Sequence, residues 1–273
     1  MPATPTALIA QLTDTHVVEP GCTEELWVDN TARVREAVVS INDEVPAMSA
    51  VLATGDLTNG GRPGEFEMLA ECLAPLDAQL LPLAGNHDHR GRLRATFPNV
   101  PWADAEHASW IVAIDGVRLV GLDSTRPGEP GAAYDTTRDR WLRTQLRSSF
   151  AGPTILALHH PPFVTGIEWM DRSGFLGLDR LAAALTQHPV DLVVCGHMHR
   201  PIIGAVAGIP AQVGLSTVQS VALDLSVGSR PAVIRDPSGY VIHRIHGRDI
   251  VSHTRYIATG HEPLVPTWAA EMP

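Results

Sequence analysis

Short apolar runs alternate with helix-like segments along the first two-thirds of this 273-residue chain. The apolar runs have the length of strands, whereas the segments between them place apolar residues at helical spacing. The expected strands are Ala7–Leu12, Ala50–Ala53, Leu80–Leu83, Thr154–Leu158 and Asp191–Cys195. The expected helices are Asn30–Val45, Gly64–Leu76, Thr136–Phe150 and Leu178–Gln187. This alternation predicts an α/β fold built from parallel βαβ units.

Two further patterns indicate antiparallel pairing. The hairpin-turn signal Asp115-Gly116 separates the apolar runs Trp110–Ile114 and Arg118–Leu122. After Gly196 the chain shows five short β-like runs: Ile202–Val206, Ala211–Leu215, Val218–Leu225, Val241–Ile245 and Val251–Ile257. The C-terminal third is therefore expected to form a second, mostly antiparallel sheet.

The composition excludes several classes of function. The formal net charge of -10 argues against a general nucleic-acid or anionic-membrane binder, because such proteins present a basic surface. The chain contains no lysine, which excludes Schiff-base chemistry and a lysine-dependent phosphate loop. No apolar run has the length of a membrane span, and no signal peptide is evident. The three cysteines do not suggest a disulfide framework, which favours the cytoplasm.

Polar residues with metal-binding side chains follow five of the expected strands. These stretches are Asp14-Thr15-His16, Gly55-Asp56, Gly85-Asn86-His87-Asp88, His159-His160-Pro161-Pro162 and Gly196-His197-Met198-His199. Open α/β sheets place their sites at the carboxyl ends of strands, so we expect these residues to meet. Each motif alone is weak evidence, since a single histidine after a strand is usually structural. Five motifs in sequence order at strand ends indicate one site.

The ligand types indicate borderline divalent ions. Imidazole and carboxylate groups without thiolate suit Mn, Fe, Zn or Co better than Ca or Mg. Seven side chains are candidate ligands: Asp14, His16, Asp56, Asn86, His159, His197 and His199. That number is too large for one tetrahedral ion and fits two ions about 3.5–4 Å apart. The i, i+2 spacing of Asp14 and His16 is expected to project both side chains in the same direction from extended backbone.

Taken together, the motifs D-x-H, G-D, G-N-H-D, H-H-P-P and G-H-x-H resemble the calcineurin-like metallophosphoesterase superfamily over residues 7 to about 200. Gly55–Pro63, Asp123–Arg126 and Met170-Asp171 further resemble class III cyclic nucleotide phosphodiesterases and bacterial glycerophosphodiesterases. Asn59 stands where purple acid phosphatases have a tyrosine ligand, and Asp88 stands where protein phosphatases have glutamate. Both of those branches are therefore disfavoured.

The resemblance implies a fold of two packed mixed β-sheets flanked by helices, with a β-rich C-terminal extension. On this reading, residues 1–215 form the catalytic core. Residues 216–273 complete the second sheet and could form a cap over the site or an oligomer interface. A homo-oligomer, a dimer or higher, is expected from the same analogy.

The resemblance also assigns roles to the motif residues. The first metal would be held by Asp14, His16, Asp56 and His199. The second would be held by Asp56, Asn86, His159 and His197, with Asp56 bridging. The uncharged Asn86 ligand is expected to make the second site weaker. The substrate phosphate would contact Asn86, His87 and His199.

Three further residues are candidates for catalysis or substrate binding. His87 resembles the residue that contacts phosphate and protonates the leaving oxygen. Asp88 is expected either to orient an imidazole by a hydrogen bond or to cap a helix. Arg62 lies beside the G-D motif and is a candidate phosphate ligand, since arginine forms forked hydrogen bonds to phosphate.

The implied activity is hydrolysis of small phosphodiesters by attack of a metal-bound hydroxide, without a covalent enzyme intermediate. Cyclic nucleotides such as 3′,5′-cAMP or 2′,3′-cyclic nucleotides are the leading substrates, and glycerophosphodiesters come next. Two alternatives remain open. The same metals would serve a phosphomonoesterase, and the fold could also act as a catalytically silent binding scaffold.

Overall fold

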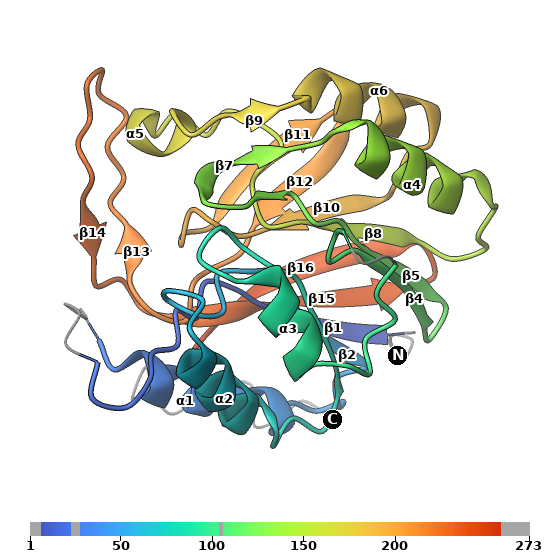
Figure 1. The fold of residues 1–273 in the computed structure, drawn as a ribbon. Coiled ribbons are helices and arrows are strands. Elements are labelled where there is room, and N and C mark those ends of the chain that lie inside the picture. Colours follow the sequence, from blue (N-terminus) through green and yellow to red (C-terminus); the bar gives the residue numbers. More distant parts are fainter. Residues whose placement is uncertain (1–6, 23–27, 104–105, 258–273) are drawn as a thin grey trace, which may run out of the picture.

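Two mixed sheets form the centre of the fold in the computed structural model, which describes residues 7–22, 28–103 and 106–257 (Figure 1). The first sheet contains, in spatial order, β16 (Asp249–Tyr256), β15 (Gly239–His246), β1 (Ala7–Leu12), β2 (Ala50–Ala53) and β3 (Gln79–Pro82). The second contains β11 (Ile202–Val206), β12 (Ile209–Val213), β10 (Leu192–Cys195), β8 (Thr154–Ala157), β5 (Val117–Gly121) and β4 (Trp110–Ile114). The strands predicted to form βαβ units pair in parallel within each sheet.

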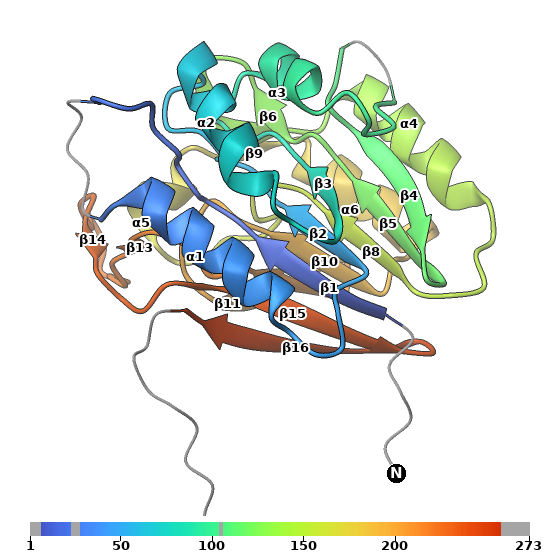
Figure 2. The same cartoon turned by 90° about the horizontal axis from the view of Figure 1, so that it is seen from below.

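Helices cover both outer faces of the pair of sheets, as Figures 1 and 2 show from two directions. The first sheet packs against α1 (Asn30–Asn42), α2 (Pro63–Leu73) and α3 (Arg90–Thr96). The second sheet packs against α4 (Thr136–Arg147) and α6 (Leu178–Gln187). A short helix, α5 (Glu168–Asp171), lies between β8 and α6 in the chain. The four-layer arrangement predicted from the sequence is confirmed.

Strand β1 shows why the central strands read as unbroken apolar runs. Its alternate residues Leu8 and Ala10 face the helices, whereas Ala7 and Ile9 face the second sheet. Successive side chains of a strand point to opposite faces, and both faces are covered here. Every residue of β1 is buried as a result.

The C-terminal strands join a different sheet from the one predicted. β15 pairs antiparallel with β1, with His243 opposite Ile9, so the C-terminal part completes the first sheet. β11 and β12 extend the second sheet instead. The prediction that 216–273 completes the second sheet is wrong, because an apolar run does not reveal which open edge it will occupy. Residues 258–273 of that part lie outside the described residues.

Two small sheets complete the fold. β6 (Thr125–Arg126), β7 (Glu129–Ala133) and β9 (Phe175–Leu176) form one near the second main sheet. β13 (Ser220–Val221) and β14 (Val233–Ile234) form a hairpin arm beside α5 at the edge of the molecule (Figure 1). The strand predicted over Val218–Leu225 is thus much shorter, since Leu223 and Leu225 lie in solvent and pack into no core. Among the described helices, none combines the length and apolar character needed to cross a membrane.

Candidate metal centre

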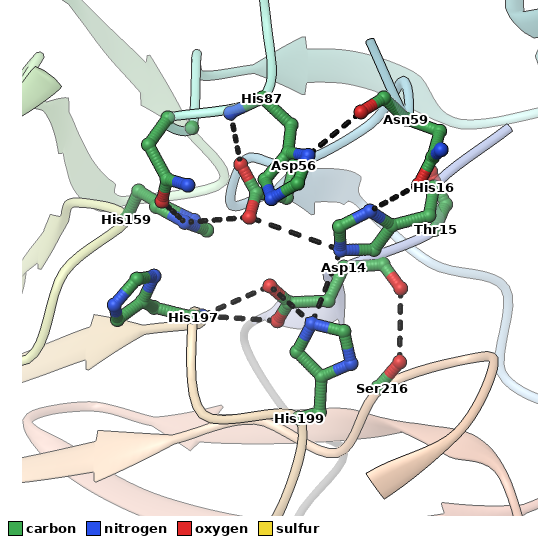
Figure 3. A network of polar contacts seen from close by, with 12 residues as sticks. Asp14, Thr15, His16, Asp56, Asn59, His87, His159, His197, His199 and Ser216 are labelled. Atoms are coloured by element: carbon green, nitrogen blue, oxygen red, sulfur yellow. Dashed lines mark hydrogen bonds and ion pairs between the residues drawn. The ribbon is translucent and has the colours of Figure 1, made fainter. Parts of the chain in front are cut away.

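The seven predicted ligands meet at the carboxyl ends of strands from both sheets. Asp14 and His16 follow β1, Asp56 follows β2, and Asn86 follows β3. From the second sheet, His159 follows β8, and His197 and His199 follow β10. Figure 3 shows the labelled side chains of this group converging on one space between the two sheets.

Four of these side chains form a compact first group. The ligand atoms of Asp14, His16, Asp56 and His199 all lie within 4.8 Å of one another. His199 Nε2 lies 3.6 Å from Asp14 Oδ1, and His16 Nε2 lies 3.8 Å from Asp56 Oδ2. This group is the set that the sequence analysis assigned to the first metal.

His159 and His199 direct Nε2 toward that space, because Nδ1 of each ring has a backbone partner. His159 Nδ1 lies 2.9 Å from the Thr54 carbonyl oxygen, and His199 Nδ1 lies 2.9 Å from the Gln219 carbonyl oxygen. Carbonyl oxygens only accept, so each Nδ1 carries the proton and each neutral ring keeps a lone pair on Nε2. Such backbone partners are typical of metal-binding histidines.

The contact between His16 and His199 tests whether a cation fits. Their Nε2 atoms lie 3.1 Å apart, while His16 Nδ1 donates to Asn59 Oδ1 at 3.2 Å. In the neutral rings, two lone pairs therefore face each other inside a buried site. A positive charge between the rings removes that repulsion, so the donor set fits a divalent metal ion.

Asp56 joins the first group to the second. Its Oδ2 atom, which faces His16, also lies 3.3 Å from His159 Nε2. His159 Nε2 in turn lies 3.2 Å from Asn86 Oδ1. The His197 ring lies beside the His159 ring, with 5.2 Å between their centroids. The carboxylate predicted to bridge thus stands between the two ligand groups.

His160 lies close enough to His159 and His197 to be considered a ligand, but its ring nitrogens are engaged elsewhere. Nε2 lies 3.2 Å from the Pro130 carbonyl oxygen, and Nδ1 lies 2.9 Å from Ser124 Oγ. Because Nε2 donates to the carbonyl, Nδ1 accepts the Ser124 hydroxyl proton. Both ring nitrogens of His160 are thus engaged within the protein, which leaves neither free to bind a metal ion.

The backbone that delivers the ligands is strained. Five of the predicted ligands have positive φ: Asp14, His16, Asp56, His197 and His199. This left-handed conformation costs on the order of 1–3 kcal/mol per residue and persists only where its surroundings enforce it. The amides of Asp14 and His16 donate to the carbonyls of Gly55 and Asp56, both at 3.0 Å. The extended backbone predicted for the D-x-H motif is therefore wrong.

Two glycines make room for the carboxylates. A Cβ on Gly85 would lie 2.2 Å from the backbone nitrogen of Asp56, and one on Gly196 would lie 2.1 Å from Thr13 Oγ1. Real Cβ contacts do not come this close. Both positions require glycine so that neighbouring loops can pack directly on Asp56 and Asp14.

Charges within the centre depend on one another. Burial alone would raise the pKa of Asp56, but the neighbouring His159 holds it well below its usual value. Burial would lower the pKa of His159, but the Asp56 carboxylate and the carboxylate of Asp14 raise it to about 9. Burial and the charge of His159 lower the pKa of His197 to about 3. Without metal, a proton on His159 balances Asp56, so protons and metal ions compete for that nitrogen.

His87 lies exposed at the rim of the centre, next to the ligand Asn86. Its Nδ1 donates to the Asn59 carbonyl oxygen at 2.7 Å, and its amide donates to Asp56 Oδ1 at 2.8 Å. Burial of part of the ring opposes its charge, but the Asp56 carboxylate outweighs this and raises the pKa of His87. The ring can therefore hold a proton at Nε2 beside the ligand groups.

Asp88 does not orient an imidazole as one prediction proposed. Its Oδ1 accepts the amide and hydroxyl of Thr58, at 2.9 and 2.7 Å. Its Oδ2 accepts the amides of Leu57 and Gly85, at 3.0 and 2.9 Å. Nor does it cap α3, whose N-cap is His89. Asp88 instead ties the loop after β3 to the loop after β2, which fixes the spacing of Asn86 and Asp56.

Arg62 lies at the start of α2, close to two glutamates. Its guanidinium lies 3.8 Å from Glu19 Oε1 and 4.0 Å from Glu65 Oε1. Its amide donates to Glu65 Oε2 at the start of α2. These contacts give Arg62 a local structural role, and its contact with substrate phosphate stays a prediction.

Two cavities adjoin the ligand cluster. One, of about 330 Å³, is lined by Asn86, His87, Arg90, Arg92 and Arg126. The other, of about 100 Å³, is lined by His197 and apolar side chains that include Phe163 and Met170. From the sequence, Arg126 was included only within a segment that resembles the family, and this residue was not singled out.

A four-layer α/β fold with adjoining carboxylate and imidazole ligand groups at its strand ends defines the class of metal-dependent phosphoesterases. The chain belongs to the calcineurin-like phosphoesterase family, whose family model matches residues 7–201. The resemblance inferred from the five motifs is confirmed.

Several curated relatives cover most of the chain. A probable glycerophosphodiester phosphodiesterase GpdQ of Arcobacter nitrofigilis is 29% identical, over 94% of this chain and 95% of its own length. A probable cyclic nucleotide phosphodiesterase of Rhodopseudomonas palustris is 32% identical, over 89% of each chain.

A solved structure shares the fold. The purple acid phosphatase PPD1 of yellow lupin superposes with a TM-score of 0.68 at 13% identity. The alignment covers 93% of this chain but only 52% of the lupin enzyme, so the present chain spans about half of that protein. At this identity the likeness supports the fold alone.

Proposed function

We propose that this protein is a phosphodiesterase that uses two divalent metal ions to hydrolyse small phosphodiesters. Cyclic nucleotides and glycerophosphodiesters are the proposed substrate classes, since relatives named for both activities match nearly the whole chain. One observation carries the proposal: the Asp56 carboxylate stands between two groups of ligand atoms. A single shared carboxylate between imidazole-rich groups is the arrangement that a pair of ions requires.

The distances support the two ligand sets that the family resemblance implies. Asp14, His16, Asp56 and His199 would hold the first ion, and Asp56, Asn86, His159 and His197 the second. Mn, Fe, Zn or Co suits these ligands. When bound, such ions neutralise the phosphate charge and lower the pKa of water to near neutrality. The chain's own contribution is to fix the ligands, through Thr54, Gln219 and Asn59 on the imidazoles.

His87 is the proposed general acid. Its Nδ1 is occupied by the Asn59 carbonyl, so the proton available to substrate sits on Nε2. Although partial burial of the ring opposes its charge, in the metal-free protein the Asp56 carboxylate raises the pKa of His87, which favours the protonated ring that a general acid needs. His87 would then donate this proton to the leaving oxygen, and solvent would restore it through the exposed face of the ring.

Location and assembly belong to the same proposal. The three cysteines are few and lie far apart in the sequence, which suits a reducing cytoplasm. The arm formed by β13 and β14 presents exposed apolar side chains, among them Leu223, Leu225 and Val227. Contiguous exposed apolar surface is typical of interaction sites, so we propose that the arm contributes to a homo-oligomer interface or caps the site.

The first experiment compares two nitrophenyl substrates on metal-stripped protein reloaded with Mn, Fe, Zn or Co. We expect bis(p-nitrophenyl) phosphate to be hydrolysed faster than p-nitrophenyl phosphate. Asp56→Ala should abolish turnover, whereas the matched control Asp249→Ala, at an exposed strand end, should retain it. A preference for the monoester would indicate a phosphatase. Absence of turnover with every metal would reject the enzyme and favour a binding scaffold.

A further inference from the structure

The 330 Å³ cavity beside Asn86 and His87 differs in charge from the protein as a whole. The chain carries a formal charge of -10, yet three arginines and two histidines line this cavity. Its single lining carboxylate, Asp88, already accepts four hydrogen bonds from Leu57, Thr58 and Gly85. The cavity therefore presents positive charge directly beside the ligand Asn86.

The three arginines differ in what they can still bind. The Arg90 side chain is paired with Asp123 and donates to the carbonyl of Thr125 at 2.6 Å. Arg92 Nη1 donates to the Gly61 carbonyl at 2.7 Å. Arg126 Nη2 lies 3.9 Å from Glu129 Oε1, at the outer limit of an ion pair, and Glu129 is mostly exposed. Of the three, Arg126 has the most donor capacity left for a ligand.

The backbone next to Arg126 is held rigidly. The carbonyl of Thr125 accepts from Arg90 and also from Arg138, at 2.7 Å. The amide and hydroxyl of Thr125 both donate to the buried Asp123 carboxylate, at 2.8 and 2.7 Å. The backbone beside Arg126 is therefore already fixed before a ligand binds. Only the Arg126 side chain has to become ordered, which lowers the entropic cost of binding.

The place of the cavity decides which part of a substrate enters it. The reacting phosphate must lie at the ligand cluster, and His87 faces the leaving oxygen if it is the acid. Because His87 also lines the cavity, the group attached to that oxygen would extend toward Arg126. Resting on the proposed function, we propose that Arg126 pairs with a second anionic group, a carboxylate or a phosphate, on the leaving arm of the phosphodiester.

Two substrate pairs test this, each differing by one anionic group. Glycerophosphoserine carries a carboxylate that glycerophosphoethanolamine lacks. The dinucleotide pApA carries a 5′-phosphate that ApA lacks. The metal-loaded protein should prefer the more anionic member of at least one pair, and the pair that responds identifies the anion. No preference in either pair would overturn the inference.

Arg126→Gln supplies the decisive variant, since the side chain is 30% exposed and its replacement should not impair folding. We expect kcat/KM for the preferred anionic substrate to fall about tenfold, mainly through KM, as for a lost charged hydrogen bond. Its less anionic partner should change much less, and Arg126→Lys should recover part of the loss. Arg94→Gln, the same charge change on α3, is the matched control. Equal losses on both members of a pair would overturn the inference.

A binding measurement separates this inference from the proposed function. In a His87→Ala background, calorimetry should show the dissociation constant of the anionic substrate rising about tenfold on Arg126→Gln. An unchanged constant would overturn the assignment of Arg126. Failure of the wild-type protein to hydrolyse bis(p-nitrophenyl) phosphate, which has no second anionic group, would reject the proposed function while leaving the binding result intact.

Discussion

At the scale of single residues, the orientation of three imidazoles says more about function than their identity does. His16, His159 and His199 each direct Nδ1 toward an oxygen acceptor and Nε2 toward the centre. A histidine that is merely structural tends to use both nitrogens within the protein, as His160 does with Ser124 and Pro130. By this criterion His159 has a nitrogen available for a metal ion, whereas its neighbour His160 does not.

Metal binding should therefore stabilise the fold measurably. Adding Mn²⁺ to metal-stripped protein is expected to raise the melting temperature, since ligand at 100 times its dissociation constant adds about 2.7 kcal/mol. His16→Ala should reduce the rise, whereas the exposed His253→Ala should not. Titration calorimetry should resolve a weaker second site, because Asn86 brings no charge. Equal melting temperatures with and without metal would contradict the assignment.

The acid role of His87 predicts a dependence on the leaving group. His87→Ala should slow hydrolysis of an alkyl or ribose ester by about 10²–10⁴-fold, the usual contribution of general acid catalysis. A nitrophenolate leaves without protonation, so bis(p-nitrophenyl) phosphate should lose much less. The measurement is the hydrolysis rate of the metal-loaded variant with both substrates. Equal loss of rate on the two would show that His87 is not the general acid.

The sequence indicated which side chains gather at the centre better than it indicated which groups orient them. Asp14 and His197 could be recognised by type, because carboxylate and imidazole after an apolar run are chemically distinctive. The orienting groups of Thr54 and Gln219 are backbone carbonyls, which every residue possesses. The role of Asp88 depends on which amides surround it, and only the folded chain shows that.

At the scale of elements, close loop packing at the strand ends imposes glycine. Gly85→Ala should destabilise the fold by about 1–3 kcal/mol and weaken metal binding, because its Cβ would overlap the Asp56 backbone. At Gly60 the nearest atom to a new Cβ lies 3.5 Å away, an ordinary contact, so Gly60→Ala is the matched control. Urea denaturation of both variants measures the difference, and equal stabilities would refute the packing argument.

The sequence could not show which strands pair with each other in the sheets. β1 leaves one edge open after pairing with β2, and β15 fills it. Part of what joins them is a buried polar chain. His243 Nδ1 lies 2.8 Å from Ser252 Oγ, and its Nε2 lies 3.3 Å from Gln11 Oε1. Gln11 Nε2 donates in turn to the carbonyl of Cys195 on β10, at 2.8 Å. The chain thus links β16, β15 and β1 to the second sheet, through contacts that apolar periodicity does not encode.

This buried chain predicts a pH dependence of stability. Burial lowers the pKa of His243 to about 4, against about 6.5 in the unfolded chain. Between these values the unfolded state binds more protons, so stability falls as the pH drops from 6.5 to 4. The loss is roughly 3 kcal/mol at most. His243→Gln should flatten the slope of unfolding free energy against pH relative to wild type. Parallel curves for the two proteins would contradict this account.

At the scale of the whole molecule, the arm formed by β13 and β14 is notable for its exposed apolar side chains. The arm of β13 and β14 projects beside α5 (Figure 2). The amide of Gly228 in the arm donates to Glu168 Oε2 at 2.6 Å. Its outer apolar side chains have no comparable cover, since Leu223 is 60% and Leu225 64% exposed. β15 and β16 follow the arm and belong to the first sheet, so truncating the chain before the arm would remove core strands.

The oligomer prediction is therefore tested by substitution within the arm. We expect the wild-type protein to have the mass of two or more copies of the 29.3 kDa chain. The double change Leu223→Asp and Leu225→Asp should shift it to a single copy, because a charge inside an apolar interface is costly to desolvate. Val45→Asp changes a still more exposed apolar residue, beyond α1, and should leave the mass unaltered. Light scattering on all three proteins distinguishes the outcomes. If the mass is unchanged and diester turnover falls only in the arm variant, the arm acts as a cap over the metal centre. If the wild-type protein is a monomer and the arm variant keeps its turnover, both roles are excluded.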